Sequence, residues 1–123
     1  MHIRPFEPQQ LVPDNGLRAR RLLPWEGLPA PFEGSWCSVA PGASSGAHAH
    51  HEHEIWIAMS GAAEIVHDGG RSAFAAGDLA YFAPHEPHQV VNDGDEGFAM
   101  YAVWWDGETV GRSGLAAAAH EGA

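Results

Sequence analysis

The sequence predicts a single all-β domain, either a sandwich or a barrel. From Ser35 onward, runs of four to eight residues are separated by Gly, Pro, Asp or Asn, which is typical of short strands joined by turns. Helical periodicity competes with this pattern only between Leu115 and His120, and eight or more short strands without intervening helices favour a sandwich or barrel. The length of 123 residues fits one core and leaves little room for a second domain.

The first 34 residues differ from the remainder because they contain six of the nine prolines. Proline fixes φ and lacks an N–H donor, so residues 1–34 are predicted to form an extended N-terminal arm with one or two short strands. The best strand candidate in this arm is residues 18–23. We interpret its arginines as side chains on a solvated strand edge and favour this over a binding patch.

Residues 35–106 are predicted to form the barrel itself. Its strands are expected at about 35–40, 46–51, 54–60, 62–67, 71–75, 79–82, 87–92 and 97–105. The turn at residues 67–71 contains Asp-Gly and Gly-Gly, which supply the positive φ angles that a hairpin needs. Residues 107–123 are rich in small side chains and are predicted to be a loose tail, apart from one short helix at 115–119.

The composition excludes several classes of partner. Six basic residues, all of them Arg, oppose sixteen acidic ones and give a formal net charge of −10. Nucleic acids and anionic membranes are both bound through basic side chains, so we expect neither partner. The N-terminus lacks the apolar core of a signal peptide, no apolar run is long enough for a membrane span, and Cys37 has no second cysteine for a disulfide. We therefore expect a cytoplasmic protein.

Histidine is the residue type that most needs an explanation, since nine are present and four of them lie between positions 48 and 53. On an extended strand, His48 and His50 face the same side about 7 Å apart, because side chains alternate. Two imidazoles and a carboxylate make a metal chelate, and Glu54 can join them after a tight turn through residues 51–53. The candidate for a fourth ligand is His88, which follows a proline-rich turn far along the chain.

These residues resemble the two sequence motifs of the cupin family. The first motif is a glycine, five residues, His-x-His, three or four residues, Glu, six residues and a second glycine, and this chain matches every position. The second motif is a glycine, five residues, Pro-x-Gly, two residues, His, three residues and Asn; here Ala83 replaces the proline and His85 replaces the second glycine. The matching residues are Gly42, His48, His50, Glu54, Gly61, Gly77, His88 and Asn92.

The cupin resemblance covers about residues 35–105 and implies a small barrel of the double-stranded β-helix, or jelly-roll, type. It also implies one divalent transition metal ion in the mouth of the barrel, bound by His48, His50, Glu54 and His88. With nitrogen and oxygen donors only, zinc is our first choice, and Fe(II), Mn, Ni or Cu also suit this set. The resemblance selects no reaction, because cupins include many kinds of enzyme, storage proteins and sugar-binding regulators.

A second resemblance involves the stretches 50–61 and 100–106, which are similar to the zinc-binding cupin domain of hydrazine synthetases. In that family, a synthetase-like domain activates an amino acid and esterifies it to an N-hydroxylated amine, and the cupin rearranges the ester to form an N–N bond. The resemblance implies that this chain works with a separate amino-acid-activating, synthetase-like enzyme.

The residues around the expected metal site have predicted roles. The substrate pocket is predicted to include Trp56, Phe82, Met100 and Trp104, of which Trp56 lies two residues after Glu54 on the same strand face. His85 and Glu86 lie in the turn before His88 and are the predicted catalytic residues, able to move protons at the rim of the site.

Apolar residues are also expected on the outer face of the barrel. Trp104 and Trp105 must point to opposite faces of one strand, and Ile55 and Ile57 face away from Glu54. Apolar side chains in such positions favour a homodimer.

Three functions stay open on the sequence alone. The first hypothesis is an enzyme of specialised metabolism in which the metal acts as a Lewis acid on a small polar substrate. The second is an Fe(II)-dependent dioxygenase. The third is a non-catalytic module that binds a small ligand or a metal.

Overall fold

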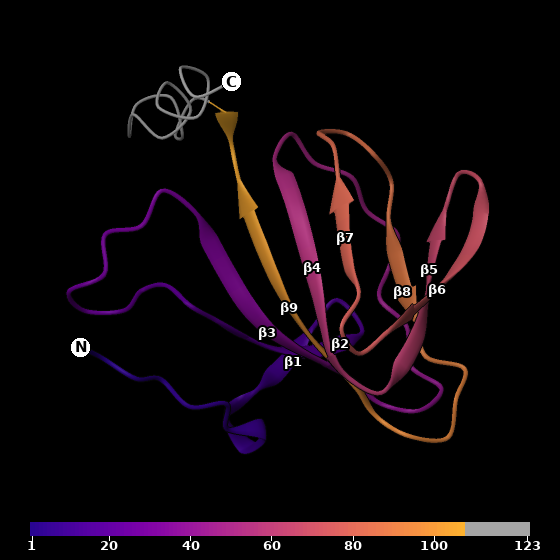
Figure 1. Cartoon of the computed structure of the whole chain (residues 1–123), viewed down its shortest axis with the longest axis horizontal. Coiled ribbons are helices and arrows are strands. Elements are labelled where there is room, and N and C mark those ends of the chain that lie inside the picture. Colours follow the sequence, from indigo (N-terminus) through magenta and orange to yellow (C-terminus); the bar gives the residue numbers. More distant parts are fainter. Residues whose placement is uncertain (108–123) are drawn as a thin grey trace.

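The computed structural model describes residues 1–107, whose regular secondary structure is almost entirely β-strand. A short 3₁₀ turn at Pro8–Gln10 precedes nine strands: β1 (Val12–Asp14), β2 (Leu17–Arg21), β3 (Glu33–Val39), β4 (His53–Ser60), β5 (Ala62–His67), β6 (Gly70–Ala75), β7 (Leu79–Phe82), β8 (Gln89–Val91) and β9 (Phe98–Trp105). Figure 1 shows β5, β6 and β8 gathered on one side of β4 and β7, with β3 and β9 on the other side.

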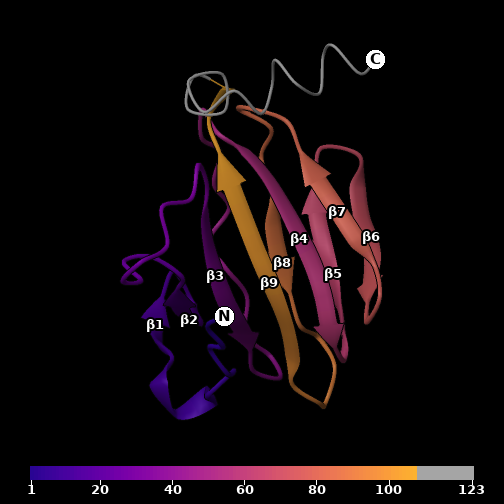
Figure 2. The ribbon, with the colours of Figure 1, turned by 60° about the vertical axis from the view of Figure 1, so that its left-hand side comes forward.

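The strands form two antiparallel sheets that pack as two layers. The larger sheet has the order β1-β2-β3-β9-β4-β7, and the smaller has the order β6-β5-β8. In Figure 2 the larger sheet lies in front of β5 and β8. This arrangement confirms the predicted all-β class and the jelly-roll architecture.

The core lies between the two layers, because each strand turns alternate residues inward. On β4 the inward residues are Glu54, Trp56 and Ala58, and all three are buried. On β9, Phe98 and Met100 are no more than 2% exposed, and burying each side chain stabilises the fold by about 1.5–3 kcal/mol. The polar Glu54 therefore belongs to the same inward row as the core residues of β4.

Most strands between residues 33 and 105 form within two residues of their predicted bounds, but the predicted strand at 46–51 is wrong. Only two isolated bridges, Ser44 with Val91 and His48 with His88, pair this part of the chain with its neighbour. Between the two bridges, the first segment advances four residues, from Ser44 to His48. The second advances only three, from His88 to Val91, so an extra residue interrupts the ladder. The chain still runs beside β8 and extends the smaller sheet irregularly.

The N-terminal segment contributes a hairpin, residues 12–21, that the sequence prediction identified only in part. Strands β1 and β2 pair across a tight turn at Asn15 and Gly16, whose φ angles are 51° and 84°. Asn-Gly at such a position is a strong signal of a type I′ hairpin turn, and it is the signal that predicts β1. Because β2 pairs with β3, the hairpin extends the larger sheet.

The predicted helix at 115–119 and the tail that contains it lie outside the described residues. Among residues 1–107, no helix has the length and apolar character needed to cross a membrane.

Candidate metal centre

The structure brings together the four side chains predicted as metal ligands, here called the ligand cluster. His48, His50, Glu54 and His88 each offer one donor atom, and these atoms all lie within 4.8 Å of one another. Glu54 projects from β4 in the larger sheet, whereas His88 directly precedes β8 in the smaller sheet. The backbone N–H groups of His48 and His88 donate to each other's carbonyl oxygens at 3.2 and 3.0 Å. The ligand cluster therefore takes residues from both layers.

Contacts within the ligand cluster are short. The Nε2 atom of His50 lies 2.7 Å from Oε1 of Glu54, and the Nε2 atom of His88 lies 3.4 Å from the same oxygen. The Nε2 atoms of His48 and His88 are 2.9 Å apart. Three ring nitrogens and one carboxylate oxygen thus meet at a common centre, and such a set of N and O donors suits a divalent transition metal.

The other ring nitrogen of each histidine in the cluster faces a backbone carbonyl oxygen. The Nδ1–O distances are 3.3 Å from His48 to Gly46, 3.2 Å from His50 to Glu52, and 3.0 Å from His88 to Glu86. A carbonyl oxygen only accepts, so these contacts favour the tautomer in which Nδ1 carries the ring proton and donates it. In that tautomer the three Nε2 atoms face the common centre and are free to bind a metal.

Glu54 is held in its ionised form although its residue is only 6% exposed. Burial raises the pKa of Glu54, but contacts with His88, Trp56 and His50 outweigh burial and hold the pKa below its ordinary value. Trp56 donates its indole N–H to Oε2 at 2.5 Å, which leaves Oε1 for the ligand cluster. An ionised carboxylate is the form that binds a metal.

His88 is held by aromatic rings as well as by its hydrogen bond. Phe82 stacks on His88 with 4.4 Å between ring centroids and 28° between ring planes, and Trp56 meets it edge-on at 5.3 Å and 89°. Since His88 is only 2% exposed, this packing fixes the orientation of its ring.

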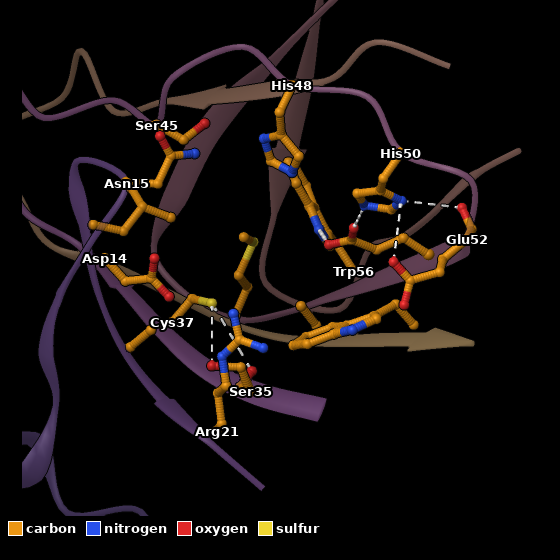
Figure 3. A pocket seen from close by; sticks show the side chains of 16 residues that line it. Asp14, Asn15, Arg21, Ser35, Cys37, Ser45, His48, His50, Glu52 and Trp56 are labelled. Carbon is orange, nitrogen blue, oxygen red and sulfur yellow. Dashed lines mark hydrogen bonds and ion pairs between the residues drawn. The ribbon is translucent and has the colours of Figure 1, made fainter. Parts of the chain in front are cut away.

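A cavity of about 410 Å³ opens beside the ligand cluster (Figure 3). Its apolar lining consists of Leu17, Ala19, Cys37, Trp56, Met100, Ala102 and Trp104. Its polar lining, beyond His48, His50 and Glu54, consists of Asp14, Asn15, Arg21, Ser35, Ser45 and Glu52. A cavity of this size with both apolar and polar lining suits a small molecule that carries polar groups.

Three of the four predicted pocket residues, Trp56, Met100 and Trp104, line this cavity. Phe82 is not among the lining residues, because its ring packs against His88 instead. Trp105, the neighbour of Trp104, stacks on His53 with 5.3 Å between ring centroids. The two adjacent tryptophans therefore occupy different environments, as strand alternation predicts.

The two predicted catalytic residues lie in the turn before His88 and do not line the cavity. His85 is exposed, and its φ of 66° shows why the family motif has a glycine there. Its backbone N–H donates to the carbonyl of His50 at 2.6 Å. Glu86 is also exposed, and its carboxylate accepts from the N–H of Ala83 at 3.0 Å. These contacts shape the turn that presents His88, and a role in proton transfer stays a prediction.

The hairpin at residues 12–21 supplies a part of the cavity that sequence reasoning missed. The sequence interpretation places Arg21 on a solvated strand edge. Arg21 is indeed exposed, but its side chain also lines the cavity. Arg21 shares its face of β2 with Leu17 and Ala19, which also line the cavity. The alternation from Leu17 through Ala19 to Arg21 is the signal that identifies this inward face.

The fold and the ligand cluster define a small two-layer β-protein with a candidate site for a divalent metal. The family model of the cupin domain matches residues 35–104, which is more than half of the chain. The chain therefore belongs to the cupin family.

Solved structures agree with this assignment. The chain is 62% identical to a Cupin 2 conserved barrel domain protein from Salinispora arenicola, with a TM-score of 0.85 over 91% of this chain and 94% of that one. It is 36% identical to a protein from Photorhabdus luminescens, with a TM-score of 0.82 over 89% of this chain and 92% of that one. A predicted oxalate decarboxylase from Thermotoga maritima is 23% identical, with a TM-score of 0.71 over 85% of this chain and 98% of that one, and this likeness concerns the fold alone.

Proposed function

We propose that this cupin binds one divalent transition metal ion, zinc in the first place, and is an enzyme that acts on a small polar molecule. The observation that supports this most is the meeting of three Nε2 atoms and one ionised carboxylate beside a cavity of about 410 Å³. When bound, the metal supplies Lewis-acid polarisation of a carbonyl or hydroxyl group.

The residues of the cavity have separate tasks in this proposal. The backbone carbonyls behind the three histidines keep their rings in one tautomer, and Trp56 keeps the Glu54 carboxylate oriented. Met100 and Trp104 exclude water from one wall, which strengthens electrostatic contacts with a bound substrate. His85 and Glu86 are the proposed proton-transfer residues, and their exposure limits that role to substrate atoms at the rim.

Metal analysis of untagged protein as purified is the experiment that tests the metal centre. We expect one metal ion per chain in the wild type and loss of that metal in His48→Ala and in His88→Ala. His67→Ala is the matched control, because His67 is hydrogen-bonded to Ser72 at the start of the β5–β6 hairpin and takes no part in the ligand cluster. Equal metal content in the wild type and in both cluster variants would overturn the assignment.

Two alternative functions can be distinguished from this proposal by measurement. The three-histidine, one-carboxylate donor set also suits Fe(II), so oxygen uptake by iron-loaded protein in the presence of a substrate would indicate a dioxygenase. Binding of a small ligand to the metal-loaded protein without turnover would indicate a non-catalytic module. The resemblance to hydrazine synthetases is not tested by these structural relatives, so N–N bond formation and a separate synthetase-like partner stay predictions.

A further inference from the structure

Arg21 lines the cavity but takes no part in the ligand cluster. It ends β2, and Figure 3 shows its guanidinium reaching into the cavity from the side opposite His48 and His50. The Cζ atom of Arg21 lies over the Trp104 ring, 5.3 Å from the ring centroid. A cation is attracted to the face of an indole ring, so Trp104 holds this guanidinium in position.

Arg21 differs from the other four arginines of residues 1–107. Each of those uses its guanidinium on an oxygen of the protein: Arg4 on the carbonyl of Leu22, Arg18 on the carbonyl of Leu11, Arg20 on Glu7 and Arg71 on Asp93. Within the described part of the chain, the guanidinium of Arg21 contacts the Trp104 ring and has no hydrogen bond or ion pair. Its N–H donors are therefore available to a molecule in the cavity.

Two carboxylates line the cavity outside the ligand cluster, those of Asp14 and Glu52. Glu52 lies beside the cluster, with Oε1 4.0 Å from Nδ1 of His50. Asp14 pairs in register with Leu17, which is four residues, or about 13 Å of strand, from Arg21. Neither carboxylate forms an ion pair with the guanidinium of Arg21.

We propose that Arg21 binds a carboxylate group of the substrate while another polar group of the same molecule lies at the ligand cluster. A guanidinium matches a carboxylate with two parallel hydrogen bonds, and no other described residue of the cavity lining offers a permanent positive charge. The second contact rests on the proposed metal centre. The substrate class is then a small carboxylic acid with a second, metal-binding group.

Arg21 belongs to a segment that lines the cavity but supplies no member of the ligand cluster. It lies on the N-terminal hairpin, outside residues 35–104 where the cupin family model matches. The part of the barrel that the family model covers supplies the ligand cluster, and the hairpin supplies the group that selects among small molecules.

Two probes that differ in one group test the inference by calorimetric titration of the zinc-loaded protein. The first probe is the monohydroxamate of succinic acid, in which the hydroxamate binds zinc and the carboxylate is free. The second is the same molecule with the carboxylate replaced by a neutral carboxamide. We expect the acid to bind the wild type at least about tenfold more tightly than the amide, because the contact is charge-assisted.

Three variants test whether Arg21 causes the preference for the acid over the amide. Arg21→Gln is expected to bind both probes equally, and Arg21→Lys to keep a reduced preference, since an ammonium group lacks the planar fork. Arg20→Gln removes the same charge from the neighbouring residue, which pairs with Glu7 outside the cavity, and is expected to keep the full preference. Equal binding of the two probes by the wild type, or an unchanged preference in Arg21→Gln, would overturn the inference and leave the metal centre in place.

A measurement without metal keeps this test separate from the proposed function. Metal-free protein is titrated with glutarate and with glutaramide. The tryptophan fluorescence, to which Trp104 beneath the guanidinium contributes, reports binding. A signal from glutarate alone, lost in Arg21→Gln and kept in Arg20→Gln, supports the inference even where zinc is not bound. No difference between the two titrants contradicts it.

Discussion

One hydrogen bond at Glu54 decides which carboxylate oxygen faces the ligand cluster. Trp56 donates to Oε2, and Oε1 is left 2.7 Å from Nε2 of His50. Trp56 also meets the His88 ring edge-on, so a single indole fixes two members of the cluster. The tryptophan is therefore part of the site although it offers no metal ligand.

Replacing this tryptophan tests its positioning role. We expect Trp56→Phe to weaken zinc binding about 10- to 100-fold, because Oε2 loses its donor and the carboxylate can rotate. We also expect a loss of about 1–3 kcal/mol in the free energy of unfolding, since a buried acceptor is left without a partner. Competition with a chelator gives the zinc affinity, and urea unfolding gives the stability. Trp105→Phe is the control, because Trp105 stacks on His53 and does not line the cavity; equal zinc affinity in the two variants would argue against the role.

Because its thiol is buried, Cys37 is expected to lower the free energy of unfolding in alkaline solution. Burial raises the pKa of its thiol from 9.0 to about 12, so the folded chain keeps a proton that the unfolded chain releases above pH 9. Stability from this group is complete below pH 9 and falls as the pH rises toward 12, by up to about 1.4 kcal/mol per pH unit. Urea unfolding at pH 8 and pH 10 should therefore show a smaller decrease for Cys37→Ala than for the wild type. The same decrease in both proteins would show that the thiol does not titrate in this way.

Among the structural elements, the turn between β1 and β2 is the one that supports the site from a distance. Asn15 donates from Nδ2 to the carbonyl of Gly46 at 3.4 Å, and the same carbonyl accepts from Nδ1 of His48 at 3.3 Å. The N–H of Gly46 in turn donates to the carbonyl of Asn15 at 3.3 Å. The turn therefore positions the backbone that holds one metal ligand.

Close approach of the two backbones makes Gly16 sensitive to substitution. A Cβ atom at Gly16 would lie 2.2 Å from the carbonyl oxygen of Ser44, and its φ of 84° already disfavours a side chain. We expect Gly16→Ala to lower the free energy of unfolding by more than about 1 kcal/mol and to weaken zinc binding, because the chain leading to His48 must shift. The control is Gly27→Ala, which has a φ of 80° and nothing within 4 Å, so it should cost stability without changing zinc affinity. Unchanged zinc affinity in Gly16→Ala would separate the hairpin from the metal centre.

The sequence predicted correctly those features that depend on residues close together in the chain or on a known motif spacing. Two-residue alternation placed Glu54 and Trp56 on one inward face, and the motif spacing grouped His88 with them although it is distant in sequence. Pairing between distant segments could not be predicted in the same way. The irregular run beside β8 contains an extra residue that no local pattern encodes. The hairpin can pack on this run only because Gly16 and Gly46 have no side chain.

At the scale of the whole molecule, the outer face of β4 and β7 is unusually apolar. Ile57 and Leu79 face each other in register, and their exposed fractions are 39% and 63%. Met59 and Tyr81 on the same two strands are 38% and 51% exposed. A patch of this kind is typical of a surface that another protein chain covers, which supports the proposal of a homodimer.

We expect light scattering to give twice the chain mass of 13.1 kDa for the wild type and a single chain mass for Leu79→Glu. The substitution places a charge in the proposed interface, where it would lose its water without gaining a partner. Val12→Glu is the control, because Val12 is an apolar residue of β1 with 61% exposure at the far edge of the same sheet. A wild-type protein that is monomeric at high concentration would rule out the homodimer.

The origin of the ligand cluster in both sheets has a thermodynamic consequence. Glu54 belongs to one layer and His88 to the other, so a metal ion held between them binds the folded chain and has no equivalent site on the unfolded one. Each tenfold rise of free metal above the dissociation constant then adds about 1.4 kcal/mol to the free energy of unfolding. Withdrawal of a bound metal would then lower the free energy of unfolding as well as remove the chemistry of the site.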